Sequence, residues 1–198
     1  MNDSELSTML YQIGALRSGD FTLKDGRRCP FYLDLRLLIS HPDVLSAIGT
    51  ALAERASSIP YDRIAGIPYA GLPLGVAMAL AAKRPLIYPR KETKSYGTGR
   101  LIEGEFRSGE RILVVDDVIT SGGAKLEAIV PLREAGLVVE DVLVVVDRRE
   151  AGRCLLTDQG IHVHSLLSVR AFLRCLRETG AISEAQVRTA FDFHGPER

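Results

Sequence analysis

Residues 112–125 read ILVVDDVITSGGAK, and this segment determines how the rest of the chain is interpreted. Its first four residues are apolar and mostly β-branched, which is typical of a strand buried on both faces of a parallel sheet. The strand delivers two carboxylates, Asp116 and Asp117, to the sheet edge where ligands bind in open α/β folds. The glycines and hydroxyl groups that follow open a helix, and the N-terminal amides of a helix favour an anion.

The ligand that this segment predicts has a phosphate for the turn and hydroxyl groups for the carboxylates. A ribose 5-phosphate has both. An alternative interpretation is a plain strand–turn–helix in which the two aspartates only cap the helix. The sequence contains neither GxxxxGK[ST], which is typical of P-loop NTPases, nor GxGxxG after a first strand, which is typical of dinucleotide-binding folds.

Strand and helix signals alternate on both sides of this segment, which predicts an α/β fold with a mostly parallel sheet. The expected strands are 63–67, 85–88, 111–117, 141–147 and 161–167. The expected helices are 42–56, 73–82 and 122–135, followed by two more near the C-terminus.

The first 40 residues form a separate pattern. A helix capped by Asp3 or Ser4 is expected to continue through Leu16, because its apolar residues have helical spacing. The pieces FTLK (21–24) and PFYLDL (30–35) are expected to be extended. We expect one domain, 1–198, with a core at about 41–170 and a small hood made of residues 1–40 and C-terminal elements.

Residues 89–104, PRKETKSYGTGRLIEG, interrupt the alternation because they show no apolar periodicity. They combine three glycines with four basic residues, Arg90, Lys91, Lys94 and Arg100. A structureless stretch of this length in a compact domain is usually a functional lid or a disordered segment. A solvated hairpin is the alternative interpretation.

Composition excludes a wholly disordered chain, a collagen-like chain and a coiled coil. The 198 residues are 46% hydrophobic and 25% charged, which is ordinary for a globular domain. Because 25 basic residues balance 25 acidic ones, we expect local anion sites and no nucleic-acid partner. No apolar run is long enough for a membrane span, and the N-terminal residues do not resemble a signal peptide.

Cysteines and histidines give weaker signals. Cys29, Cys154 and Cys175 are odd in number and lack CxxC spacing, so we interpret them as free thiols of a reducing cytoplasm. His162 and His164 would share one face of a strand. A metal-binding pair is the alternative there, but we favour a partly exposed strand face and assign no metal ligand in the chain.

A family resemblance joins these observations. VVDDVITSGGAK (114–125) resembles the motif that binds phosphoribosyl diphosphate (PRPP) in type I phosphoribosyltransferases. Four other segments are similar to orotate phosphoribosyltransferases, most of all to the branch found in bifunctional UMP synthases. They are GDFTLKDGRRCPFYLDLR (19–36), IPYAGLPLG (67–75), RKETKSYGTGRLIEG (90–104) and VVVDRREAG (144–152).

The resemblance implies the type I phosphoribosyltransferase fold and a Mg²⁺-dependent reaction. Orotate and PRPP would give orotidine 5′-monophosphate and pyrophosphate in pyrimidine biosynthesis. It also implies a cytoplasmic homodimer in which residues 89–104 form a lid over the neighbouring subunit's site, and we expect no fused decarboxylase barrel within the 198 residues. A transferase for another base and a PRPP-sensing regulator are the alternatives on this fold.

Site residues carry over position by position from the family's motifs. The resemblance implies catalytic roles for Lys94, Asp116 and Asp117, with the two aspartates on the ribose hydroxyls. It assigns to orotate Phe31, Tyr32, Thr120 and Arg148, the last on the carboxylate. It assigns to PRPP Lys24, Tyr69, Ala70, Arg90, Lys91, Lys94, Tyr96, Val118, Ile119, Thr120, Ser121, Gly122, Gly123 and Ala124.

Two positions depart from the pattern of many bacterial members. Ala70 stands where a lysine is common, and Tyr96 stands where a lid histidine is common. Ala70 leaves one positive charge fewer for the diphosphate. The bifunctional branch shares both kinds of departure, so we do not interpret them as loss of activity.

Overall fold

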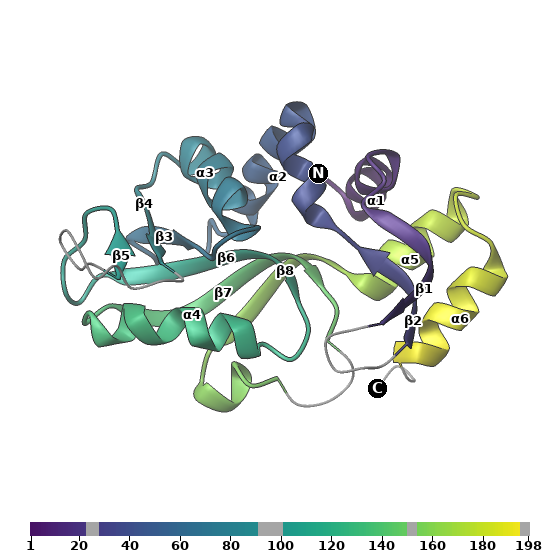
Figure 1. Ribbon diagram of the computed structural model, residues 1–198. Coiled ribbons are helices and arrows are strands. Elements are labelled where there is room, and N and C mark those ends of the chain that lie inside the picture. The colour runs from purple at the N-terminus through teal and green to yellow at the C-terminus, as the bar shows by residue number, and fades with distance from the viewer. Residues whose placement is uncertain (23–27, 91–100, 150–153, 195–198) are drawn as a thin grey trace.

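A mostly parallel sheet forms the centre of the computed structural model, which describes residues 1–22, 28–90, 101–149 and 154–194 (Figure 1). Within those ranges the strand order is β5-β4-β3-β6-β7-β8, and β5 alone runs antiparallel to its neighbour, β4. The strands are β3 (Arg63–Gly66), β4 (Leu86–Pro89), β5 (Ile102–Glu103), β6 (Arg111–Ile119), β7 (Val138–Asp147) and β8 (His162–Ser168).

Helices cover both faces of this sheet. Helices α2 (Pro42–Arg55) and α3 (Gly71–Ala82) pack on one face, and α4 (Gly123–Glu134) lies on the other (Figure 1). In β6, Leu113 and Val115 belong to the core beneath α2 and α3, whereas Ile112 and Val114 belong to the core beneath α4. All four side chains are buried, which confirms the prediction of a strand buried on both faces.

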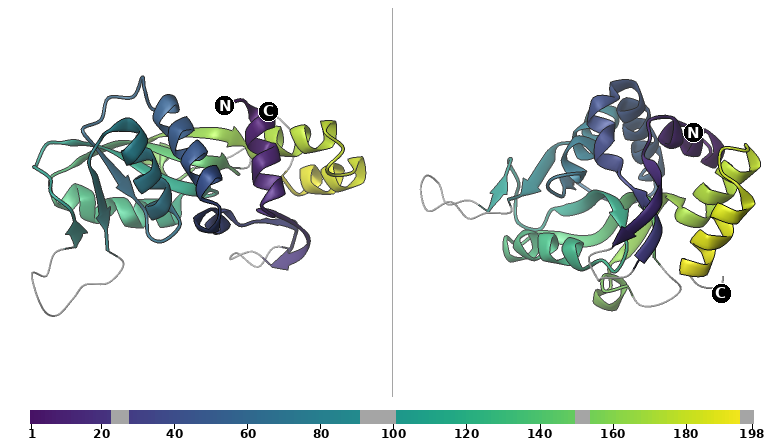
Figure 2. Two further views of the ribbon diagram at one scale, coloured as in Figure 1. Left: turned by 90° about the horizontal axis from the view of Figure 1, so that it is seen from above. Right: turned by 45° about the vertical axis from the view of Figure 1, so that its right-hand side comes forward.

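The N-terminal and C-terminal elements pack together beyond one end of the sheet. Strands β1 (Leu16–Thr22) and β2 (Arg28–Leu33) form an antiparallel hairpin, and the 3-10 helix η1 (Leu35–Ser40) follows. Helix α1 (Asp3–Gln12) packs against α5 (Val169–Glu178), and α6 (Glu184–His194) packs against β2 (Figure 2). A second short 3-10 helix, η2 (Thr157–Gln159), precedes β8. In the described part of the chain, no helix combines the length and apolar character needed to cross a membrane.

Three local predictions were wrong. The first helix is capped by Asn2, which forms a capping box with Glu5, and it ends before Gly14, whose φ of +74° turns the chain so that Leu16 starts β1. Helix α3 begins at Gly71 rather than at residue 73, because the Gly71 amide already donates to the Ile67 carbonyl oxygen at 2.9 Å.

The ends of the 89–104 segment are also more ordered than predicted. Pro89 pairs with Ile102, and Tyr88 pairs with Glu103. Buried Ile102 anchors this hairpin base in the core beneath α4, which explains why a strand forms where no periodicity is visible. Residues 91–100 lie outside the described ranges.

Candidate functional site

Two consecutive carboxylates, Asp116 and Asp117, lie toward the carboxyl end of β6, and we call them the acidic pair. Asp116 Oδ2 lies 2.6 Å from Lys125 Nζ. Asp117 Oδ1 accepts a hydrogen bond from the Val118 amide at 2.7 Å. The N-cap of α4 is Gly122, which makes no side-chain cap hydrogen bond, so neither aspartate caps that helix and the capping interpretation is wrong.

Burial has the largest effect on the protonation of Asp117. Together with the charge of the neighbouring Asp116 carboxylate, it raises the pKa of Asp117 to about 6. The Lys125 ammonium and the Val118 amide act in the opposite direction, because each stabilises the ionised form of Asp117. Asp117 therefore changes charge near pH 6.

Lys125 is a candidate site residue that the sequence interpretation missed, although it belongs to the segment 112–125. It lies in the first turn of α4, and only 6% of its surface is exposed. Its position is four and seven residues before Ile129 and Leu132, the other buried residues of that helix face. A lysine at the start of an otherwise apolar stripe was the available signal, because such a stripe faces the sheet.

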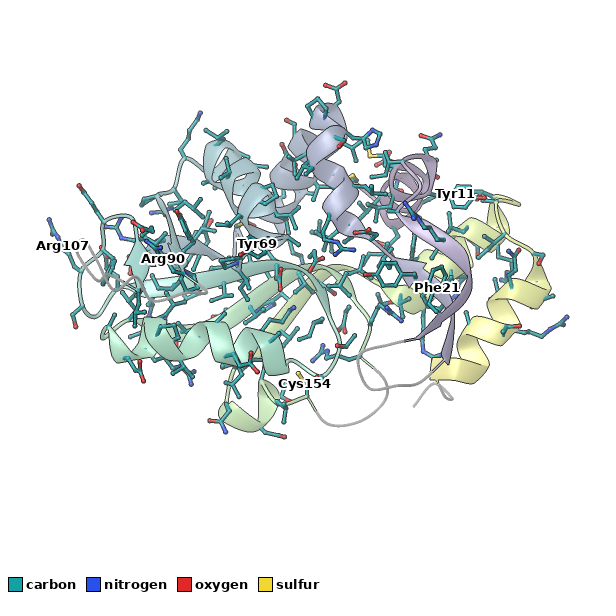
Figure 3. All side chains as sticks on the ribbon, viewed as in Figure 1. Tyr11, Phe21, Tyr69, Arg90, Arg107 and Cys154 are labelled. Atoms are coloured by element: carbon teal, nitrogen blue, oxygen red, sulfur yellow. The ribbon has the colours of Figure 1, made fainter. Side chains whose placement is uncertain are left out.

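Residues 120–124, which we call the phosphate turn, connect the acidic pair to α4. The side chains of Thr120 and Ser121 are exposed, and Gly122 has a φ of +88°. The turn rests on the segment that contains Cys154: the Leu155 amide donates to the Ser121 carbonyl oxygen at 3.0 Å (Figure 3). Exposed hydroxyls at a helix N-terminus suit an anion, and the assignment of this turn to the 5-phosphate stays a prediction.

The turn at 67–71 approaches the acidic pair from the neighbouring strand. The Ile67 amide donates to the Val115 carbonyl oxygen at 3.1 Å, and the Pro68–Tyr69 peptide is cis. Tyr69 is exposed beside the start of α3 (Figure 3). Gly71 packs so closely on β6 that a Cβ there would lie 2.5 Å from the Val115 carbonyl oxygen and 3.0 Å from Asp116 Oδ1.

We expect Gly71→Ala to destabilise the protein by about 1–3 kcal/mol, because the added methyl group must push α3 away from the backbone of β6. PRPP affinity should fall as well, since Asp116 is displaced. Urea denaturation and calorimetric titration with PRPP measure the two effects. Gly123→Ala is the control for stability, because its Cβ would make an ordinary contact of 3.7 Å with Leu155. Equal unfolding free energies for the two variants would contradict the close-packing argument.

The β1–β2 hairpin brings together two residues that are predicted to bind orotate, Phe31 and Arg148. The guanidinium carbon of Arg148 lies 5.0 Å from the centre of the Phe31 ring, and both residues are buried. The Arg148 amide donates to the Ile119 carbonyl oxygen at 2.8 Å, which places Arg148 beside the end of β6. A cation over an aromatic face is a favourable contact.

Tyr32 has different surroundings. Its ring lies 5.5 Å from that of Phe21, and its hydroxyl group accepts a hydrogen bond from Arg36 Nη2 at 3.1 Å. Arg36 also pairs with Asp34 at 2.7 Å. Successive residues of a strand face opposite ways, so Phe31 and Tyr32 present themselves on different faces of β2. Arg36 is a further candidate that the sequence interpretation missed.

Several predicted contacts with the diphosphate involve residues 89–104. Arg90 Nη1 pairs with Glu103 Oε1 at 2.8 Å across the hairpin base, and its assignment to the diphosphate stays a prediction (Figure 3). Ala70 immediately precedes α3. Lys24, Lys91, Lys94 and Tyr96 lie outside the described residues.

Histidine and carboxylate positions bear on metal binding. His164 Nε2 lies 2.7 Å from Asp141 Oδ1, so a carboxylate of β7 is the partner of this histidine. Among the described residues, no three His, Cys, Asp or Glu side chains are grouped to hold a metal ion.

The sheet order, the acidic pair with its phosphate turn, and the hairpin over the sheet edge define a type I phosphoribosyltransferase. No protein-family model matches the chain. An orotate phosphoribosyltransferase from Methanocella arvoryzae is 43% identical over 167 residues, which are 83% of this chain and 94% of the relative. The chain belongs to the orotate phosphoribosyltransferase family.

Solved structures support the same assignment. The UMP synthase of Leishmania donovani is 36% identical and superposes with a TM-score of 0.89 over 96% of this chain and 42% of that one. An orotate phosphoribosyltransferase of Mycobacterium tuberculosis H37Rv, solved in complex with PRPP, is 28% identical and covers 86% of this chain and 98% of its own, with a TM-score of 0.69. The chain spans only 37–38% of the length of other relatives, which are named as bifunctional enzymes or uridine 5′-monophosphate synthases.

Proposed function

We propose that this protein transfers the 5-phosphoribosyl group from PRPP to orotate, giving orotidine 5′-monophosphate and pyrophosphate. The observation that carries the proposal is the meeting of three parts at one sheet edge. The acidic pair suits ribose hydroxyls, the phosphate turn suits the 5-phosphate, and Arg148 stacked on Phe31 suits a flat, acidic base. The PRPP complex of the Mycobacterium tuberculosis relative supports the choice of donor.

The mechanism follows from the charges that develop when the bond from ribose C1 to pyrophosphate breaks. The sugar becomes cationic, and the negative carboxylates of the acidic pair can stabilise it. The leaving group becomes more anionic, and preorganised cations there give the largest available assistance. Lys94, Lys91 and Arg90 are the residues proposed for this role. Mg²⁺, held mainly through the diphosphate oxygens of PRPP, would neutralise part of the same charge.

A homodimer completes the proposal. Helix α3 (GLPLGVAMALAA) carries no charged residue, and it exposes Val76 and Leu80 beside Leu45 of α2. Contiguous apolar surface of this kind marks a protein–protein interface. We assign it to a second copy of the chain, whose lid would then act on the neighbouring site in the cytoplasmic enzyme.

Arg148→Lys is expected to raise the KM for orotate at least about tenfold while the KM for PRPP changes much less. A guanidinium can meet a carboxylate through two parallel hydrogen bonds, which an ammonium cannot reproduce. Initial-rate kinetics with each substrate varied in turn measure both constants. Arg149→Lys is the matched control, because Arg149 pairs with Asp147 instead. Equal changes in both Michaelis constants would contradict the contact with orotate.

The test of the proposed function is an assay with orotate, PRPP and Mg²⁺, in which the nucleotide product is identified by mass spectrometry. Parallel reactions replace orotate with uracil, adenine or hypoxanthine. We expect turnover with orotate alone. Turnover with another base would make the protein a different phosphoribosyltransferase, and PRPP binding without turnover of any base would make it a sensor.

A further inference from the structure

The buried lysine beside the acidic pair is unusual for its position. Lysines are almost never fully buried unless they are paired, and Lys125 is buried with its ammonium on Asp116. Taking both charges out of water costs free energy that the ion pair often fails to recover. A merely structural role would be served at least as well by an apolar residue in the stripe of Ile129 and Leu132.

The surroundings of the acidic pair make Lys125 important for its charge. The residue opposite Asp116 on β7 is Val144, and Gly71 of α3 covers Asp116 without a side chain. From η1, the guanidinium of Arg36 lies near enough to Asp117 to interact electrostatically with it, but it is mostly exposed and already paired with Asp34. The direct contact with a positive charge therefore comes from Lys125.

We propose that Lys125 is a positioning residue for phosphoribosyl transfer. Its ammonium holds the Asp116 carboxylate at the sugar site and balances one of the two negative charges there. The two carboxylates and the Lys125 ammonium together then carry a net charge of about −1. This charge is enough to stabilise a cationic sugar. The inference rests on the proposed function, because it assigns Lys125 a part in that reaction.

Loss of this ammonium would change the protonation of the pair. The two adjacent carboxylates repel each other, and burial together with the Asp116 charge raises the pKa of Asp117 to about 6 even though the Lys125 ammonium lowers it. Without the ammonium, the carboxyl groups keep a proton to higher pH. A protonated carboxyl group stabilises a cationic sugar poorly, so activity at slightly acidic pH depends on Lys125.

The experiment measures kcat/KM for PRPP from pH 5.5 to 9 in the wild type, Lys125→Met and Lys125→Arg. In Lys125→Met we expect the acidic limb of the profile to move up by about one pH unit or more. The loss should therefore reach about fivefold or more at pH 6 and be smaller at pH 8.5. Lys125→Arg keeps the charge and should keep the limb near its wild-type position. Lys83→Met, at the exposed C-terminal end of α3, is the matched control and should leave the profile unchanged.

Other outcomes would overturn the inference. A loss by the same factor at every pH would show that Lys125 only supports the fold, and an unchanged profile would show that it does not act on the pair. Lys125→Gln provides a second neutral variant of different shape, so that a folding failure of one does not end the test. A wild type without activity would refute the proposed function, whereas an active wild type with an unmoved limb in the neutral variants would refute this inference alone.

Discussion

Replacement of Asp117 by asparagine is expected to lower kcat/KM for PRPP roughly 10- to 100-fold while the protein stays folded. An amide cannot accept hydrogen bonds from the ribose hydroxyls as a carboxylate does, and a lost buried hydrogen bond costs about 1–3 kcal/mol. The amide also supplies no negative charge to a cationic sugar. Calorimetric titration and initial-rate kinetics measure the two effects. Asp141→Asn, which removes the partner of His164 on β7, is the matched control and should keep its activity.

Asp117→Asn should lower activity but raise the stability of the folded protein. The pKa of Asp117 is raised in the folded protein, so the folded state holds that proton more tightly than the unfolded chain does. Stability is therefore lost as the pH rises from about 4 to about 6, and the cost persists at higher pH. Asp117→Asn removes this cost. Its melting temperature should exceed that of the wild type by more at pH 7.5 than at pH 5.

The predicted loss of PRPP affinity and the predicted gain in stability can each be contradicted separately. If Asp117→Asn left the affinity for PRPP unchanged, the assignment of Asp117 to the ribose hydroxyls would be wrong. A melting temperature that falls at pH 7.5 would show that the carboxylate stabilises the turn locally. We choose Asp117 rather than both aspartates for this test, because Asp116→Asn would also leave the buried ammonium of Lys125 without its carboxylate.

Lys94→Ala is expected to lower kcat by about 10²–10³ with little change in the affinity for PRPP. The resemblance of residues 90–104 to the family's lid carries this assignment, since Lys94 lies outside the described residues. An interaction made mainly in the transition state affects turnover more than binding, and removal of one such contact typically costs about 2.7–4 kcal/mol. Single-turnover kinetics and equilibrium binding separate the two. A loss of affinity that accounts for the whole effect would contradict a role in catalysis.

The same variants test the homodimer. A Lys94→Ala chain keeps an intact acidic pair, and an Asp117→Asn chain keeps an intact lid. If the lid acts across the interface, their heterodimer contains one site with every working part. Mixing the two weakly active parents should then restore up to about half of the wild-type activity per heterodimer. Confirmed subunit exchange without recovered activity would mean that each lid serves its own subunit.

Local sequence patterns determined much of this protein. The apolar runs at 111–117 and 141–147 predict β6 and β7, because strands covered on both faces need apolar residues at every position. The glycines and hydroxyl groups after Asp117 predict the phosphate turn, because only a few residue types permit a tight turn into a helix. These features depend on residues that are neighbours in the chain, and the family resemblance rests on the same short segments.

Long-range packing decided the rest. The contact of Arg148 with Phe31 joins segments more than 100 residues apart, and the approach of Gly71 to Val115 joins the start of α3 to β6. Leu16 fits helical spacing, yet it belongs to a strand because the turn at Gly14 and the pairing with Leu33 outweigh the local preference. The charge balance of the acidic pair likewise depends on where α4 packs, since only burial against β6 converts a helical lysine into the partner of Asp116.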